Sequence, residues 1–228
     1  MQKVRFGIVG IGNMGTAHSK SLLEGKIANG ELSAICEPKK AKADAILSLT
    51  GAENVVAFAD YTEMLHSGLI DAVIVAVPPY DHQALVCQAL EAGLHVICEK
   101  PAGVYTKQVK AMNEAAQKSN KLFGMMFNQR SGSIYRKMRE MVAGGELGDI
   151  KRVNWIITNW YRPQAYYDSG DWRATWSGEG GGVLLNQCPH QLDLWQWICG
   201  MPAKITAHMK FGQWHDIEVE DDVTAYVE

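Results

Sequence analysis

The sequence predicts an α/β protein in which a doubly wound parallel sheet is followed by a smaller α+β domain with a mainly antiparallel sheet. Three observations lead to this fold class. Apolar segments alternate with helical segments over residues 1–125, a glycine-rich turn directly follows the first apolar segment, and residues 71–77 are apolar on both faces. Strands that are covered by helices on both sides have this continuous apolar character.

The elements expected in the first part, residues 1–125, alternate regularly. Strands are expected at 4–9, 32–36, 71–77, 94–98 and 122–127, and helices at 13–24, 41–49, 81–92 and 106–119. Pro78 and Pro79 end the third strand, and Gly93 suits the left-handed position that follows a helix. Helices of about 10–14 residues between strands imply right-handed crossovers, so this part should form one Rossmann-type domain.

The second part, residues 126–228, has a different pattern. A helix is expected at 131–143, a long strand at 150–160, a helix from the glycine run 180–182 to about residue 199, and strands at 205–211 and 223–227. Because the sequence ends inside the last of these strands, we expect the sheet to be incomplete through C-terminal truncation. A natural terminus on an edge strand is the alternative.

The composition argues against several classes of function. The 228 residues carry a formal net charge of −3, so no positive field indicates nucleic acid or an anionic membrane as a partner. The apolar segments have the length of strands, and the N-terminus lacks the apolar core of a signal peptide. The five cysteines show neither a CxxC pair nor a metal-like spacing with histidine, which indicates reduced thiols, a cytoplasmic location and no metal site.

The segment 10–15, GIGNMG, follows the first expected strand and opens a helix. Its first glycine permits a tight turn, its second lets the backbone approach a pyrophosphate, and its third lets the helix pack close to the strand. The positive end of the helix then faces the phosphates. A purely structural glycine turn is the alternative. The residues expected to bind the cofactor here are Gly10, Gly12, Asn13, Met14 and Gly15.

Glu37 follows the second expected strand, about 20 residues after Gly15. An acid at this point accepts hydrogen bonds from the ribose hydroxyls of the adenosine and repels a 2′-phosphate, which favours NAD over NADP. Lys39 and Lys40 weaken that preference, because either ammonium can reach a 2′-phosphate. NADP therefore stays an alternative, as does a merely solvated acid at position 37.

Glu99, Lys100 and Pro101 follow the fourth expected strand. Ligands of open α/β sheets bind outside the carboxyl ends of the strands, so Lys100 is expected to face the ligand cleft. An ammonium there can hydrogen-bond a substrate hydroxyl and stabilise negative charge on its oxygen. On position alone, a surface lysine is the alternative.

Three motifs together resemble the Gfo/Idh/MocA oxidoreductases, the relatives of glucose–fructose oxidoreductase and inositol dehydrogenase. They are the glycine loop, the triplet EKP at 99–101 and the segment GGGVLLNQCPHQLD at 180–193. The resemblance covers essentially the whole chain. The segment 75–79 with His82 resembles the family's turn near the nicotinamide, and the triplet NQR at 128–130 resembles the segment that enters its second domain.

The resemblance implies an NAD(H)-dependent dehydrogenase or reductase that acts on a CH–OH group of a sugar, polyol or derivative. In such enzymes the lysine, here Lys100, polarises the hydroxyl, and the histidine, here His190, is the general base or acid. Many members have an aspartate where this sequence has Asn186, which can orient a hydroxyl but cannot relay a proton. Residues 186, 190 and 193 should share one helical face, from which Asp193 can orient His190.

Further residues complete the expected site. The irregular segment 161–176 is aromatic and polar, which suits sugar recognition, and Arg173 suits a ring hydroxyl or a carboxylate; loop packing is the alternative. The remaining expected cofactor contacts are Pro78, His82, Glu99 and Lys100, and the expected substrate contacts are Asn128, Trp172, Arg173 and Asp193.

The resemblance further implies that the second domain binds the substrate and forms a homo-oligomer, a dimer or a tetramer. Two other functions stay open at this point. One is a non-catalytic, nucleotide-bound sugar sensor or repressor, and the other is an NAD-dependent glycosidase.

Overall fold

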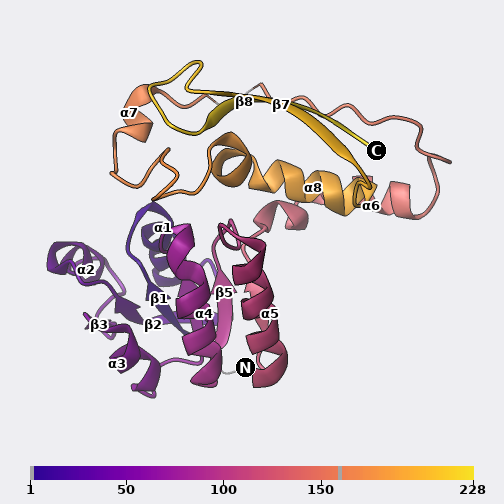
Figure 1. The fold of residues 1–228 in the computed structure, drawn as a ribbon. Helices are drawn as coiled ribbons and strands as arrows, with labels where there is room; N and C mark the ends of the chain where they lie inside the picture. The colour runs from indigo at the N-terminus through magenta and orange to yellow at the C-terminus, as the bar shows by residue number, and fades with distance from the viewer. Residues whose placement is uncertain (1–2, 159–160) are drawn as a thin grey trace. The chain divides into compact units, whose positions relative to one another are not determined.

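Each of the two units of the chain, Met1–Met126 and Phe127–Glu228, has its own sheet (Figure 1). The computed structural model describes residues 3–158 and 161–228.

In the described part of the first unit, six parallel strands form a sheet in the order β3-β2-β1-β4-β5-β6. They are β1 (Val4–Val9), β2 (Gly30–Cys36), β3 (Val56–Phe58), β4 (Ala72–Val75), β5 (His95–Cys98) and β6 (Phe123–Met125). The strand order reverses between β1 and β4, and ligands of such sheets bind at the carboxyl ends of the strands beside this reversal. The doubly wound parallel sheet is thus confirmed.

Helices cover this sheet on both faces. They are α1 (Asn13–Leu23), α2 (Lys40–Leu47), α3 (Tyr61–His66), α4 (His82–Glu91) and α5 (Thr106–Ser119). Leu22 of α1 and Ile46 of α2 share one apolar core with Ile74, whereas α3, α4 and α5 share another with Val73. Neighbouring residues of β4 belong to different cores because successive side chains of a strand point to opposite faces. This explains why the sequence of β4 is apolar throughout.

The sequence does not predict β3 or α3. Only three residues of β3 pair with β2, and two of them are exposed, so the segment shows no clear period. A signal for α3 is present, however, because the Asp60 carboxylate accepts the amide of Glu63 at 2.9 Å. An aspartate in this N-cap position is a usual start of a helix.

The second unit combines helices with one antiparallel pair of strands. In chain order these are a 3₁₀ turn (Asn128–Ser131), α6 (Ser133–Ala143), α7 (Gln164–Tyr167), a π-helical turn (Val183–Gln187), α8 (Pro189–Cys199), β7 (Ile205–Phe211) and β8 (Glu220–Val227). β7 and β8 pair with Ile205 opposite Val227. The expected antiparallel sheet is present as these two strands in the described residues.

The strand expected at 150–160 is a wrong prediction for the part that the structure describes. Residues 150–158 have no regular secondary structure, and residues 159–160 lie outside the described residues. A β-branched sequence favours a strand only where a neighbouring strand supplies hydrogen bonds and covers its apolar face. Ile150, Val153 and Ile156 are all exposed, the last at 81%, so no such face is buried here.

The single helix expected from 180 to about 199 is also a wrong prediction. The chain forms the π turn, leaves helical geometry at Cys188 and starts α8 at Pro189. The amide of Cys188 donates to the carbonyl of Val183 at 2.7 Å, which is the wide bond of a π turn. Proline has no N–H and suits the first position of a helix, which explains where α8 begins.

Two properties complete the fold. None of the helices in the described parts of the chain combines the length and the apolarity that crossing a bilayer requires. Among residues 3–158 and 161–228, no cluster of three or more His, Cys, Asp or Glu side chains is arranged to hold a metal ion.

Candidate active site

The glycine loop has the shape that a pyrophosphate requires. Gly10 has φ +88°, and a Cβ there would lie 2.7 Å from the carbonyl oxygen of Ala76. A Cβ on Gly15 would collide with the carbonyl oxygen of Gly10, so this glycine allows α1 to pack against the loop. A Cβ on Gly12 would meet no atom of the described residues within 4 Å. The loop backbone is therefore open to a ligand at Gly12.

The first turn of α1 provides donors for an anion. Gly12 is the N-cap residue, and no side chain in the described residues caps this end of the helix. Asn13 and Met14 are exposed in the first turn. The amides at such an end and its positive dipole attract phosphate groups. Loop and helix together fit the diphosphate of a dinucleotide.

Glu37 joins the glycine loop to the end of β2. Its carboxylate is buried and accepts the amide of Ile11 at 3.0 Å through Oε2 and the amide of Lys39 at 3.0 Å through Oε1. Each carboxylate oxygen keeps a further lone pair for a ribose hydroxyl. Lys40 instead pairs with Asp44 at 2.8 Å within α2. The arrangement fits a cofactor with a free ribose, as NAD has.

Glu99 holds the segment that carries Lys100. This carboxylate is buried at the carboxyl end of β5, where one oxygen lies 2.7 Å from Nε2 of His18 and the other accepts the amide of Lys100 at 3.2 Å. His18 lies on α1, one helical turn after Gly15. The helix that opens the glycine loop is thus connected to the lysine segment, and Lys100 itself is half-buried.

His82 connects the turns that follow β4 and β5. Its ring is 1% exposed, with Nδ1 2.8 Å from the carbonyl oxygen of Pro101 and Nε2 2.9 Å from that of Val77. Burial lowers the pKa of His82, and the two carbonyl partners oppose that shift. Because both ring nitrogens face the protein backbone, we infer that His82 positions the turns around Pro78 and Lys100 and does not itself contact the cofactor.

His190 lies on α8 in the second unit. Its ring packs edge-on against Phe127, with the ring centroids 6.1 Å apart. Asn186 belongs to the preceding π turn, where its backbone N–H donates to the carbonyl oxygen of Gly182 at 3.0 Å. The expectation that residues 186, 190 and 193 share one continuous helical face is therefore wrong, because the break at Cys188 separates the first from the other two.

Asp193, which the sequence suggests as a residue that orients His190 and contacts the substrate, pairs with Arg130. Its buried carboxylate forms a two-pronged ion pair with Arg130, in which Nε donates at 2.7 Å and Nη2 donates to the second oxygen. The Arg130 guanidinium also lies over the rings of Phe127 (5.8 Å) and Trp197 (5.4 Å). The Arg130–Asp193 pair thus lies beside Phe127, the ring against which His190 packs. Asn128 is exposed in the 3₁₀ turn that begins this segment.

Glu220 of β8 fixes the start of the π turn. Its Oε1 accepts the amides of Gly182 and Leu184, both at 3.0 Å. A Cβ on Gly182 would collide with the carbonyl oxygen of Glu220, so the third glycine of the run permits this close approach. The glycine run 180–182 thus allows the π turn to approach β8 closely. Glu220 was not predicted from the sequence as a residue of the site.

The segment before this turn holds two arginines against aromatic rings. Arg173 donates to the hydroxyl of Tyr166 at 2.7 Å, and its guanidinium carbon lies 4.4 Å from the Tyr166 ring centroid and 4.5 Å from that of Trp172. Arg162 packs on Tyr166 at 4.5 Å and donates to Gln187 at 3.1 Å. The sequence singled out Trp172 and Arg173 but not Tyr166 or Gln187.

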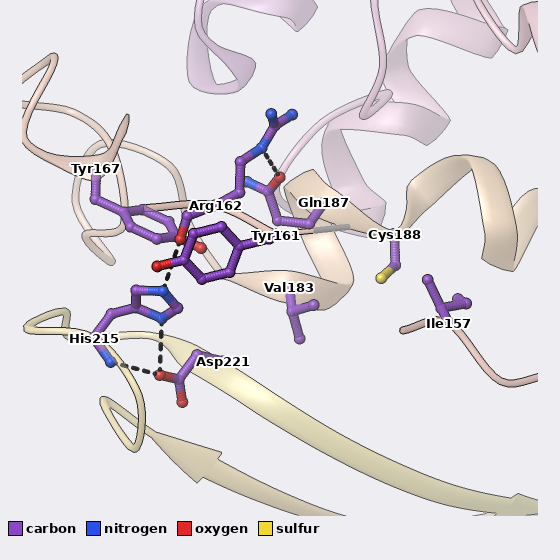
Figure 2. A pocket seen from close by; sticks show the side chains of 9 residues that line it. All are labelled: Ile157, Tyr161, Arg162, Tyr167, Val183, Gln187, Cys188, His215 and Asp221. Atoms are coloured by element: carbon purple, nitrogen blue, oxygen red, sulfur yellow. Dashed lines mark hydrogen bonds and ion pairs between the residues drawn. The ribbon is translucent and has the colours of Figure 1, made fainter. Parts of the chain in front are cut away.

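A pocket of about 120 Å³ lies beside these residues in the second unit (Figure 2). Tyr161, Gln187 and His215 are among the residues that line it. Nε2 of His215 lies 2.8 Å from the carbonyl oxygen of Arg162, and its Nδ1 lies 3.4 Å from Asp221. Figure 2 shows the Arg162 guanidinium turned away from His215 and toward Gln187.

Two family models match the two units of the chain. The model described as an oxidoreductase family with an NAD-binding Rossmann fold matches residues 4–127, and the model of the GFO/IDH/MocA C-terminal domain matches residues 135–228. The chain belongs to the GFO/IDH/MocA family. Its first unit is therefore an NAD-binding Rossmann domain, as the glycine loop and Glu37 predict.

Similar proteins of the GFO/IDH/MocA family include polyol and sugar dehydrogenases. An inositol 2-dehydrogenase of Leifsonia xyli is 28% identical over 201 residues, which cover 88% of this chain and 55% of that protein. A D-glucoside 3-dehydrogenase of Escherichia coli is 30% identical over 215 residues, which cover 87% of this chain and 59% of that protein. The chain thus spans little more than half the length of these relatives.

Solved structures of the family have the same fold. The WlbA dehydrogenase from Bordetella pertussis, in complex with NADH and UDP-GlcNAcA, matches with a TM-score of 0.87 at 28% identity, covering 99% of this chain and 67% of that one. A scyllo-inositol dehydrogenase from Lactobacillus casei, with bound NAD(H) and scyllo-inositol, matches with a TM-score of 0.75 at 26% identity, covering 92% of this chain and 60% of that one.

Proposed function

We propose that this member of the GFO/IDH/MocA family is an NAD(H)-dependent oxidoreductase that acts on a secondary alcohol or ketone of a sugar, a polyol or a derivative. The observation that carries the proposal is the connection from the glycine loop through His18 and Glu99 to Lys100. Lys100 directly follows β5, the strand that neighbours β4, and this carboxyl edge of the sheet also carries the glycine loop, which supports the proposal.

Three side chains would act on the reacting hydroxyl of the substrate. Lys100 donates a hydrogen bond to the reacting hydroxyl and stabilises negative charge on its oxygen. His190 takes the proton of that hydroxyl in oxidation and returns it in reduction. Asn186 orients the hydroxyl without carrying a proton, because an amide does not titrate. Bound NAD supplies the hydride acceptor, and NADH the donor.

The relatives support the class of substrate. The inositol 2-dehydrogenases and the D-glucoside 3-dehydrogenase are named for polyol and sugar substrates. The aromatic and hydrogen-bonding side chains of the segment 161–176, such as Trp172 and Arg173, are of the kind that line sugar sites. A homo-oligomeric state and a cytoplasmic location, both expected from the sequence, are part of the same proposal. Light scattering of the purified protein tests the first, and cell fractionation tests the second.

One assay tests the proposed activity. The protein is incubated with NAD and a panel of polyols, aldoses and aryl glycosides, and NADH and released aglycone are both followed. We expect net NADH with at least one polyol or sugar. Aglycone release without net NADH would instead indicate a glycosidase. Tight NAD binding without turnover of any panel member would indicate a sensor, and either result would contradict the proposal.

A further inference from the structure

We propose that the sugar substrate carries an oxyanion, a carboxylate or a phosphate, and that Arg173 binds it. This proposal rests on the proposed function and specifies its class of substrate. Arg173 belongs to an arginine–aromatic cluster in the second unit, made of Arg162, Tyr166, Trp172, Arg173 and Gln187.

The first step is that Arg173 is held in place before any ligand binds. Its guanidinium carbon lies 4.4 Å from the ring centroid of Tyr166 and 4.5 Å from that of Trp172, and the group donates to the Tyr166 hydroxyl at 2.7 Å. The next residue, Ala174, is 3% exposed with φ +54°, a strained conformation for a residue with a Cβ. The two ring contacts and the hydrogen bond to Tyr166 restrain the guanidinium, so less side-chain freedom is lost on binding.

The second step is that the Arg173 guanidinium forms no ion pair with a carboxylate of the described residues. Within residues 3–158 and 161–228, the Arg173 guanidinium donates the single hydrogen bond to Tyr166 and pairs with no carboxylate. A guanidinium has five N–H donors in a planar fork. Arg130 in the same unit is stacked on two rings in a similar way, but it has the carboxylate of Asp193 as its partner. A bound oxyanion would give Arg173 the anionic hydrogen-bond partner that Asp193 gives Arg130.

The third step is that three acids of the second unit are bound by groups other than Arg173. Glu179 accepts the amide of Ala174, and Asp168 accepts a hydrogen bond from Gln164 at 2.9 Å. Asp221 accepts the amides of the turn 213–215. None of these contacts neutralises Arg173, so the cluster keeps a positive charge in a half-buried setting.

The fourth step is that a second guanidinium, that of Arg162, belongs to the same cluster. Arg162 packs on the same Tyr166 ring at 4.5 Å and donates to Gln187 of the π turn at 3.1 Å. Two guanidinium groups around one ring raise the positive potential there and favour an anion over a neutral sugar. Gln187 directly follows Asn186, so the cluster is attached to the turn that leads into α8 and His190.

The test uses sugars in matched sets of one stereochemistry. Calorimetry measures binding of D-glucose, D-glucuronate and D-glucose 6-phosphate, and the corresponding galacto and manno sets, to the NAD-saturated protein. NADH formation is followed with each sugar in parallel. The variants are Arg173→Gln, Arg173→Lys and the matched control Arg152→Gln, which removes the same charge from an exposed position outside the cluster.

The proposal predicts that one class of anionic sugar, the acid or the phosphate, binds more tightly than its neutral counterpart. Arg173→Gln should weaken binding of that anion about 100-fold, which is the size expected for a lost charge-assisted, two-pronged contact, and weaken the neutral sugar less than about threefold. Arg173→Lys should give an intermediate loss, because a point charge replaces a fork. Arg152→Gln should change neither affinity.

Other outcomes overturn the proposal. Equal binding of neutral and anionic sugars, no binding of any anionic sugar, or an equal loss for both in Arg173→Gln each contradicts it. The proposed function fails separately. Oxidation of neutral sugars without preference for an anion leaves the dehydrogenase and refutes the role of Arg173. Binding of anions that depends on Arg173 but gives no NADH supports the role of Arg173 and refutes the dehydrogenase.

Discussion

Nε2 of His18 lies 2.7 Å from Oε1 of Glu99, and this contact joins α1 to the segment that carries Lys100. The side chains are 19% and 7% exposed, so water competes weakly for the contact. Since the other oxygen of Glu99 accepts the amide of Lys100, a change at His18 is passed to the lysine through one carboxylate.

His18 is therefore predicted to position Lys100. His18→Leu should lower kcat about 10- to 100-fold, the cost of slightly misplacing a reacting group, with little change in NAD affinity. His18→Gln keeps an N–H donor and should recover much of that loss. Steady-state kinetics and NAD titration of both variants test this. A loss of NAD affinity with unchanged kcat would show that His18 serves the loop and not the lysine.

Substitutions of two glycines of the loop are predicted to have different effects, one on NAD binding and one on stability. Gly12→Val adds atoms in open space at the expected phosphate position, so NAD binding should be lost while the fold is kept. Gly15→Ala forces a Cβ against the Gly10 carbonyl and should destabilise the protein by about 1–3 kcal/mol. Cofactor fluorescence and thermal unfolding separate the two effects. Normal NAD binding by Gly12→Val would contradict the phosphate-loop assignment.

Glu220 is predicted to be the main anchor of the π turn. Glu220→Ala leaves the buried amide of Gly182 and the part-buried amide of Leu184 without their acceptor, which should lower the free energy of unfolding by about 2–4 kcal/mol. Glu220→Gln keeps a carbonyl oxygen at the same position and serves as the control. Urea unfolding measures both. Equal losses in the two variants would show that the contact is not what stabilises the turn.

Asp221 is predicted to make the second unit sensitive to acid. Burial tends to raise the pKa of Asp221, but hydrogen bonds from Trp214, Gln213 and His215 outweigh it, so the pKa lies below the ordinary value. A depressed pKa means that this stabilisation is present above about pH 3.9, the value in the unfolded chain, and is lost as the pH falls through the lower folded value.

The consequence is measurable with Asp221→Asn, whose side chain does not titrate. The wild-type protein should be the more stable at pH 7, and its advantage in unfolding free energy should shrink below about pH 4. Urea unfolding at a series of pH values gives the difference directly. A difference that stays constant down to pH 3 would contradict the assignment.

Local patterns in the sequence were enough to predict most of the helices and strands of the first unit. The apolar run in β4 and the glycine loop report structure within a few residues, so their elements were found. The segment 150–158 was wrongly predicted because strand formation depends on a partner strand, which residue type alone does not reveal. The break at Cys188 was missed although Pro189, a common first residue of a helix, marks it.

The contacts that hold the candidate site could not be predicted in the same way. His18 and Glu99 are 81 residues apart in sequence, Arg130 and Asp193 are 63 apart, and Gly182 and Glu220 are 38 apart. No spacing rule links residues at such separations, since the fold alone brings them together. The resemblance to a family identified the groups proposed to touch substrate and cofactor, and the structure added those that position them.

The central claim is that Lys100 assists hydride transfer at an NAD site built on the glycine loop. The most direct measurement is single-turnover NADH formation by Lys100→Ala with the best substrate of the panel, combined with NAD titration of the same variant. We expect a rate at least about 100-fold below wild type, as for a lost electrostatic stabiliser, with NAD affinity within about threefold of wild type. An unchanged rate would contradict it.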